Sequence, residues 1–211
     1  MVGIACVFDF MDGLVARALN AHSEIGKQLD SLADMVSFGV VPGVIVFQLL
    51  KLNYSNHFIH FWFDDILPAV VAFLITIFSA IRLAKFNLDL RQSDSFIGLP
   101  TPANAILIAS IPLVLQSASA SEFVKEIILQ PYFLIVLILT SSISLISSIS
   151  LFALKFKNFS WVDNKVRYIF LLLSIALLII FKFAGIPLII ILYIVLSIIN
   201  NLVAKKSVKH L

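Results

Sequence analysis

Long apolar stretches constrain the fold of this chain more than any other feature. Residues 127–154 contain no charged side chain, and similar stretches recur along the 211 residues. A helix needs about 20 apolar residues to cross the core of a bilayer. Charged residues make up 13% of the chain, against about 25% of an average soluble domain, which leaves too little polar surface for a water-soluble globule. We therefore expect an all-α, polytopic transmembrane helix bundle.

About seven stretches have the length and composition of membrane spans. They cover residues 1–19, 32–50, 66–83, 103–119, 127–154, 166–181 and 186–203. Pro112 and Pro187 lie inside two of them, which membrane helices tolerate because neighbouring helices satisfy the freed backbone groups. We expect residues 1–211 to form one membrane domain. Its motif helices lie within residues 1–50, and the remaining spans lie within 66–203.

The distribution of Lys and Arg predicts the orientation of this bundle. Twelve of the fifteen fall in alternate loops and in the C-terminal tail, whereas Lys51, Lys125 and Lys182 fall in the loops between. Cytoplasmic loops carry the excess of basic residues. We therefore expect the loop after the first span to face the cytosol. The basic tail, Lys205 to Lys209, is interpreted as a contact for anionic lipids or as a topology signal. His57 and His60 then fall on the outer side, in what we interpret as a solvated loop.

Four aspartates near the N-terminus form two closely spaced pairs. Asp9 and Asp12 are three residues apart, and Asp30 and Asp34 are four residues apart. Each spacing places both carboxylates on one face of a helix. If the first two helices are adjacent and antiparallel, all four carboxylates meet near one membrane depth, at the cytosolic boundary.

Such a cluster of carboxylates predicts a metal site. Four unpaired anions at a membrane boundary are very costly. Divalent cations with oxygen ligands, Mg²⁺ or Mn²⁺, neutralise them and leave positions for water and substrate phosphates. Two ions that share carboxylates can stabilise both the attacking and the leaving oxygen at a phosphorus centre. Arg17 is a fixed phosphate donor, and Gly13 and Ala16 leave room for a ligand to approach.

Three alternatives remain open at this point. The four aspartates could cap or solvate separate helix ends, or line a cation-transport path. Intramembrane prenyltransferases also use aspartate-rich helices with Mg²⁺, although they usually show denser repeats in two separated regions. No Walker loop, Rossmann fingerprint or nucleic-acid patch is present in the sequence, so we expect no nucleic-acid partner.

The aspartates belong to the pattern D-x2-D-G-x2-A-R-x8-G-x3-D-x3-D, which resembles the signature of the CDP-alcohol phosphatidyltransferase family. Every fixed position is filled, by Asp9, Asp12, Gly13, Ala16, Arg17, Gly26, Asp30 and Asp34. Three further segments are similar to the serine-specific bacterial enzymes of integral-membrane type, the CDP-diacylglycerol–serine O-phosphatidyltransferases. They are LDSLADMVSFGVVPG (29–43), RLAKFN (82–87) and FIGLPTPAN (96–104).

The resemblance implies a role for each motif residue. Asp9, Asp12, Asp30 and Asp34 would bind two metal ions, with Asp34 also the base for the acceptor hydroxyl. Gly13, Ala16, Arg17, Ser23 and Gly26 would lie against the CDP-lipid. The implied reaction joins CDP-diacylglycerol and L-serine in the bacterial inner membrane, with the active site facing the cytosol. Family members usually carry one further helix before the motif helix, so we expect a segment to precede residue 1.

The acceptor is less constrained than the donor. A serine carboxylate needs a cation, and Arg82 and Lys85 end the third expected span on the cytosolic side, with Asn87 close by. The positive-inside bias alone also explains these basic residues, and glycerol 3-phosphate or inositol stays open as the acceptor. Gly39 and Gly43 form a small-xxx-small pair, which indicates close helix contact within the fold or in a homodimer.

Overall fold

The computed structural model describes residues 2–19, 23–54, 66–88, 95–118, 120–154, 158 and 160–208. Most of this chain is helical. The helices are α1 (Val2–Ala18), α2 (Glu24–Met35), a π-helical turn η1 (Val36–Val40), α3 (Val41–Tyr54), α4 (Ile66–Leu88), α5 (Thr101–Gln116), α6 (Glu122–Leu129), α7 (Pro131–Ile146), α8 (Trp161–Phe181), a 3₁₀ turn η2 (Lys182–Ala184) and α9 (Gly185–Val208). Two short strands, β1 (Ser95–Ile97) and β2 (Ser150–Phe152), pair antiparallel.

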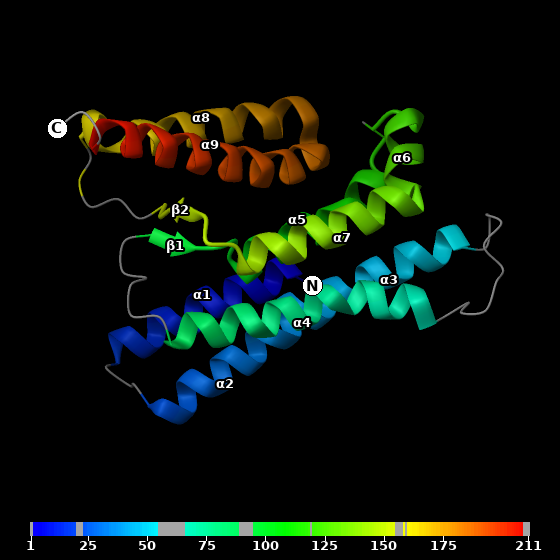
Figure 1. Ribbon diagram of the computed structural model, residues 1–211, viewed down its shortest axis with the longest axis horizontal. Helices are drawn as coiled ribbons and strands as arrows, with labels where there is room; N and C mark the ends of the chain where they lie inside the picture. The colour runs from blue at the N-terminus through cyan, green and yellow to red at the C-terminus, as the bar shows by residue number, and fades with distance from the viewer. Residues whose placement is uncertain are drawn as a thin grey trace.

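The helices form layers (Figure 1). α8 and α9 lie side by side as a hairpin, and α9 packs on α5 and on β2. α4 packs between α3 and α7, and together they bury the largest apolar cluster, which includes Val46, Ile75 and Ile138. α1 and α2 lie in the lower layer of Figure 1, where α2 packs against α4, and α1 packs against α5 and η1. The N-terminal helices are therefore positioned by the central ones rather than by the α8–α9 hairpin.

The number of membrane spans differs from the expectation. By length and composition, three helical segments of the described chain could cross a bilayer, or four if the bent pair α6 and α7 counts as one. The seven expected spans are therefore not confirmed, although the all-α class is. Many helices are exposed and apolar on their outer faces, as in an integral membrane protein.

Local breaks in the helices account for this difference. α1 has 17 residues and α5 has 16, which is short for a span. Residues 127–154 do not form one helix, because α6 ends before Pro131, α7 turns by 68° from it, and the chain from Ser147 is extended. The segment Asn164–Val203 qualifies as one 40-residue candidate, yet it reverses at Lys182, whose φ is 49°.

Two glycines of α2–η1–α3, the continuous helical run from Glu24 to Tyr54, lie close against α4. A Cβ on Gly39 would lie 3.1 Å from Ser79 Cβ, and one on Gly43 would lie 2.7 Å from Thr76 Oγ1. The small-xxx-small pair thus makes its close contact within the fold. η1 falls at this contact, directly after the second aspartate pair. A π-helical turn inserts an extra residue into the helix and is frequent at functional sites.

Candidate metal centre

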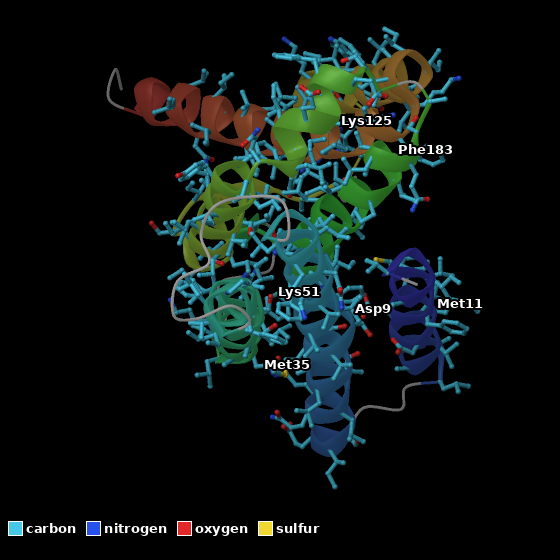
Figure 2. The ribbon with its side chains drawn as sticks, turned by 90° about the vertical axis from the view of Figure 1, so that its right-hand side faces the viewer. Asp9, Met11, Met35, Lys51, Lys125 and Phe183 are labelled. Atoms are coloured by element: carbon cyan, nitrogen blue, oxygen red, sulfur yellow. The ribbon has the colours of Figure 1, made fainter. Side chains whose placement is uncertain are left out.

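The four motif aspartates lie on two helices that face one another across a gap. α1 carries Asp9 and Asp12, and α2 carries Asp30 and Asp34. Figure 2 shows Asp9 on the side of α1 that faces the long α2–η1–α3 helix, and Met11 on the opposite side. α1 packs against α5 and η1, whereas α2 packs against α4 and η1. The two aspartate helices therefore share η1 as a neighbour, while α5 supports the first pair and α4 supports the second.

The start of α2 is fixed by its own side-chain cap. Ser23 has an extended backbone, and its hydroxyl accepts a hydrogen bond from the backbone N–H of Gly26 at 2.9 Å. This cap satisfies one of the free donors at a helix start. A Cβ on Gly26 would lie 2.9 Å from Ser23 Oγ, so glycine leaves room for the cap. Ser23 and Gly26 thus have a clear structural role, and their predicted contact with CDP-lipid stays a prediction.

The carboxylates converge as the sequence pattern predicts. One carboxylate oxygen each from Asp9, Asp12 and Asp30 lie within 4.8 Å of one another. The carboxyl group of Asp34 is within hydrogen-bonding reach of Asp9. Asp12 and Asp30 are exposed, and Asp9 and Asp34 are half-buried. Like charges this close repel one another, so the arrangement needs either cations or shared protons.

A cavity of about 450 Å³ connects this cluster to apolar side chains. One part of its wall is acidic, made by all four motif aspartates. The other part is apolar, and it includes Ile4, Ala5, Phe8 and Phe38. Phe38 is almost fully buried, at 1% exposure, so this end of the wall belongs to the packed interior. The cavity suits a ligand with a charged head and an apolar body.

The donor set fits a hard divalent cation. Mg²⁺ prefers carboxylate and water oxygens and usually keeps some positions for substrate phosphates. Three carboxylate oxygens within 4.8 Å can surround one ion, and the open side of the cavity leaves room for further oxygen ligands. Among the residues that the structure describes, no cysteine or histidine lines the cavity, and the carboxylate set that does line it suits a hard cation better than one that prefers sulfur or imidazole.

The remaining predicted donor-side residues continue the same face of α1. Ala16 follows Asp9 by about two turns, and Gly13 follows it by one. A Cβ on Gly13 would meet nothing within 4 Å, so the space above this backbone is open to a ligand. Arg17 lies in α1 as well, but its side chain falls outside the described part of the structure. Their contact with the CDP-lipid stays a prediction.

The three predicted acceptor residues lie on the last turns of α4, and the described cavity lining includes none of them. Arg82 is 4% exposed, and its guanidinium lies over the Phe86 ring at 5.3 Å from the centroid. Lys85 is exposed. Asn87 donates a hydrogen bond from its side-chain amide to Ser31 Oγ. The acceptor assignment of these residues stays a prediction.

The sequence reasoning missed two kinds of residue at this site. Phe8 and Phe38 supply the apolar wall, and their positions beside the aspartates, one residue before Asp9 and four after Asp34, were a usable signal. Ser31 contacts α4, and nothing in its local sequence pointed to that long-range partner. His57 and His60 lie outside the described residues.

Known proteins share this motif region. The family model of CDP-alcohol phosphatidyltransferase matches residues 1–141. Proteins named CDP-diacylglycerol–serine O-phosphatidyltransferase are similar in sequence. The Helicobacter pylori protein is 40% identical over 110 residues, 51% of this chain and 42% of that protein. The Bacillus subtilis protein is 38% identical over 94 residues, 44% of this chain and 48% of that protein.

A more distant relative gives the same result. The Methanocaldococcus jannaschii protein of that name is 33% identical over 117 residues, 56% of this chain and 51% of that protein. The chain thus spans about half or less of the length of the curated relatives that it matches. The matched part contains both aspartate helices and the cavity between them. On the family match, which covers most of the chain and all of the candidate metal centre, this protein belongs to the CDP-alcohol phosphatidyltransferase family.

Proposed function

We propose that this protein transfers the phosphatidyl group of CDP-diacylglycerol to the hydroxyl of L-serine, giving phosphatidylserine and CMP. The observation that carries the proposal is the cavity between α1 and α2, which is lined both by the four motif aspartates and by apolar side chains. A lipid with a charged diphosphate head and apolar acyl chains matches both kinds of lining, the head through metal ions on the aspartates and the chains through the apolar side chains. The similarity to serine-specific relatives supports serine as the acceptor.

The proposed site holds two divalent metal ions on the four carboxylates. Asp9, Asp12 and Asp30 are close enough to share an ion, and Asp34 lies against Asp9. When bound, such ions stabilise the charge that develops on the phosphate oxygens and on the leaving group. The chain itself contributes fixed ligands on two separate helices, and it contributes the apolar wall that receives the start of the acyl chains.

Asp34 is the proposed general base. It is half-buried, and both it and Phe38 line the cavity. The serine hydroxyl oxygen attacks the phosphatidyl phosphorus, and its proton passes to the Asp34 carboxylate. The bond between that phosphorus and the bridging diphosphate oxygen breaks, and CMP leaves with the oxygen. The proton then returns to solvent, so that the site is restored.

The proposed setting is the bacterial inner membrane, with the site facing the cytosol. The basic loops predicted on that side support this orientation. CMP and serine are water-soluble, whereas the donor and the product are lipids. A site between α1 and α2 at the boundary of the membrane and the aqueous phase is accessible to both the water-soluble and the lipid reactants.

A transfer assay tests the proposal. The full chain, purified in detergent micelles that contain CDP-diacylglycerol and Mn²⁺ or Mg²⁺, receives radiolabelled serine, glycerol 3-phosphate or inositol in parallel reactions. We expect metal-dependent label in phosphatidylserine and stoichiometric CMP, with Asp34→Asn as the inactive control. Lipid product labelled from one of the other alcohols, and not from serine, would identify that alcohol as the acceptor. Metal flux in proteoliposomes without any lipid product would refute the enzymatic assignment.

A further inference from the structure

The position of α2 is not fixed by apolar packing. None of its described side chains, Glu24–Met35, is buried. Leu29 and Leu32 are each 60% exposed. A helix without a buried face depends on polar contacts and on its chain neighbours for its place. Because α2 carries Asp30 and Asp34, whatever holds α2 also places half of the candidate metal ligands.

Two hydrogen bonds join α2 to the last turn of α4, and a third, within α2, connects their two ends. We call Lys27, Ser31 and Asn87, which make these bonds, the α2–α4 clasp. The Asn87 side-chain amide donates to Ser31 Oγ at 2.8 Å. The Ser31 hydroxyl donates in turn to the backbone carbonyl of Lys27 at 3.1 Å. The Lys27 ammonium donates to the backbone carbonyl of Asn87 at 3.4 Å. This last contact also places a cation at the C-terminal end of α4, where the helix dipole favours it.

A second contact holds the same helical run farther along. The Thr76 hydroxyl of α4 donates to the backbone carbonyl of Gly39 in the π-helical turn at 3.0 Å. This contact is buried, and it lies beside the core cluster that includes Ala72 and Ile75. We regard this buried contact as the fixed point of the α2–η1–α3 run on α4. The clasp is the second, more exposed point of attachment, and it is the one next to the aspartates.

The geometry makes the carboxylates sensitive to rotation of α2. Ser31 follows Asp30 directly, so the two side chains leave the helix about 100° apart, one toward α4 and one toward the cavity. A carboxylate lies about 6 Å from the helix axis, so a rotation of about 20° moves it by about 2 Å. That movement is as long as a magnesium–oxygen bond of about 2 Å. A small rotation of α2 therefore moves Asp30 and Asp34 out of bonding distance of an ion that Asp9 and Asp12 also bind.

We propose that Asn87 is a positioning residue, which sets the place of Asp30 and Asp34 for metal binding through its hydrogen bond to Ser31. The inference rests on the proposed two-metal function of the site. It gives Asn87 a role different from the acceptor contact predicted for it from sequence. Asn87 acts through Ser31 and touches neither the substrates nor the metal.

Metal binding without substrates separates these roles. Mn²⁺ titrations of the full chain in detergent, followed by electron paramagnetic resonance, give the dissociation constant of the ion. Loss of one hydrogen bond that orients a ligand pair weakens binding by about tenfold. We expect that loss for Asn87→Ala and for Ser31→Ala, and the same loss in the double variant, because the second change removes nothing further. Leu88→Ala, at an 83% exposed neighbour, is the matched control and should bind Mn²⁺ as wild type does.

Kinetics of the same variants complete the test. Positioning predicts that Asn87→Ala raises the Mn²⁺ concentration for half-maximal turnover, and that serine KM at saturating Mn²⁺ stays near that of wild type. Unchanged Mn²⁺ binding with a raised serine KM would overturn the inference and return Asn87 to the acceptor site. Additive losses in the double variant would overturn it too. If wild type binds Mn²⁺ yet transfers no serine, the proposed acceptor fails, and the binding titration still decides the role of Asn87.

Discussion

The substitution Gly98→Ala should destabilise the protein by a calculable amount. Gly98 lies between β1 and α5 with a φ of +77°. A Cβ there would lie 2.6 Å from the backbone carbonyl oxygen of Leu145 and 3.0 Å from that of Ser147. The Gly98 N–H also donates to the carbonyl of Ile149 at 2.9 Å. The left-handed backbone costs a residue with a Cβ about 1–2 kcal/mol.

The clash adds to this cost. The Leu145 carbonyl belongs to backbone and cannot swing away as a flexible side chain would, so the Gly98 hydrogen bond must lengthen or break, at about 1 kcal/mol. We expect a total loss of about 2–3 kcal/mol in the free energy of unfolding. For a chain of this size that corresponds to a midpoint lower by about 5–10 °C.

Thermal unfolding in detergent, followed by circular dichroism, measures this shift. Gly3→Ala is the matched control, because it makes the same chemical change where nothing lies within 4 Å of the added Cβ. The reasoning is refuted if Gly98→Ala melts with wild type, or if Gly3→Ala loses as much. The result bears on the site as well, since the segment after Gly98 leads into α5, which packs against α1.

Four further substitutions test three separate parts of the structure. Asp34→Asn should lower kcat by about 10²–10⁴-fold, the usual contribution of a general base, and should keep substantial CDP-lipid binding. Asp9→Asn should weaken the binding of both Mn²⁺ and the CDP-lipid. Equal and small effects of the two substitutions on turnover and on binding would count against shared metal ligation. Gly13→Ala should raise the melting temperature slightly, because alanine is more favourable than glycine in a helix interior by about 1 kcal/mol. The same change should raise the KM for CDP-diacylglycerol, and an unchanged KM would remove Gly13 from the donor site. Tyr193→Phe removes a hydroxyl that donates to the Phe152 carbonyl at 2.8 Å. The melting temperature in detergent should therefore fall by about 2–4 °C. A smaller change would show that this hydrogen bond between α9 and β2 contributes little to stability.

The aspartate site could be predicted from the sequence because its geometry is local. Spacings of three and four residues fix a common helix face whatever the helix packs against, and the short connection between α1 and α2 keeps the two pairs near each other. The convergence of Asp9, Asp12 and Asp30 follows from these two facts and is confirmed. The apolar wall did not follow in the same way, because Phe38 reaches the cavity through packing with Val2 and Ala105.

The predicted number of membrane spans is not confirmed, and it departs from the structure where non-local contacts decide the outcome. The serine-rich stretch at the end of α7 looks like part of a long span, but the chain leaves the helix at Ser147 and pairs β2 with β1, more than fifty residues earlier. Pro131, which begins α7, was a visible signal for the break between α6 and α7. Asn87 shows the same limit at the site, since its hydrogen bond to Ser31 joins residues 56 apart in sequence.

The position of bound Mn²⁺ tests the central claim most directly. Crystals grown with Mn²⁺ and measured at a wavelength where manganese scatters anomalously reveal the ion without any assumption about activity. We predict anomalous density between α1 and α2, within bonding distance of carboxylate oxygens of Asp9, Asp12 and Asp30, with Asp34 on the same cluster. Density only at other acidic groups, such as Glu122 on α6, or none between the two helices, would contradict it.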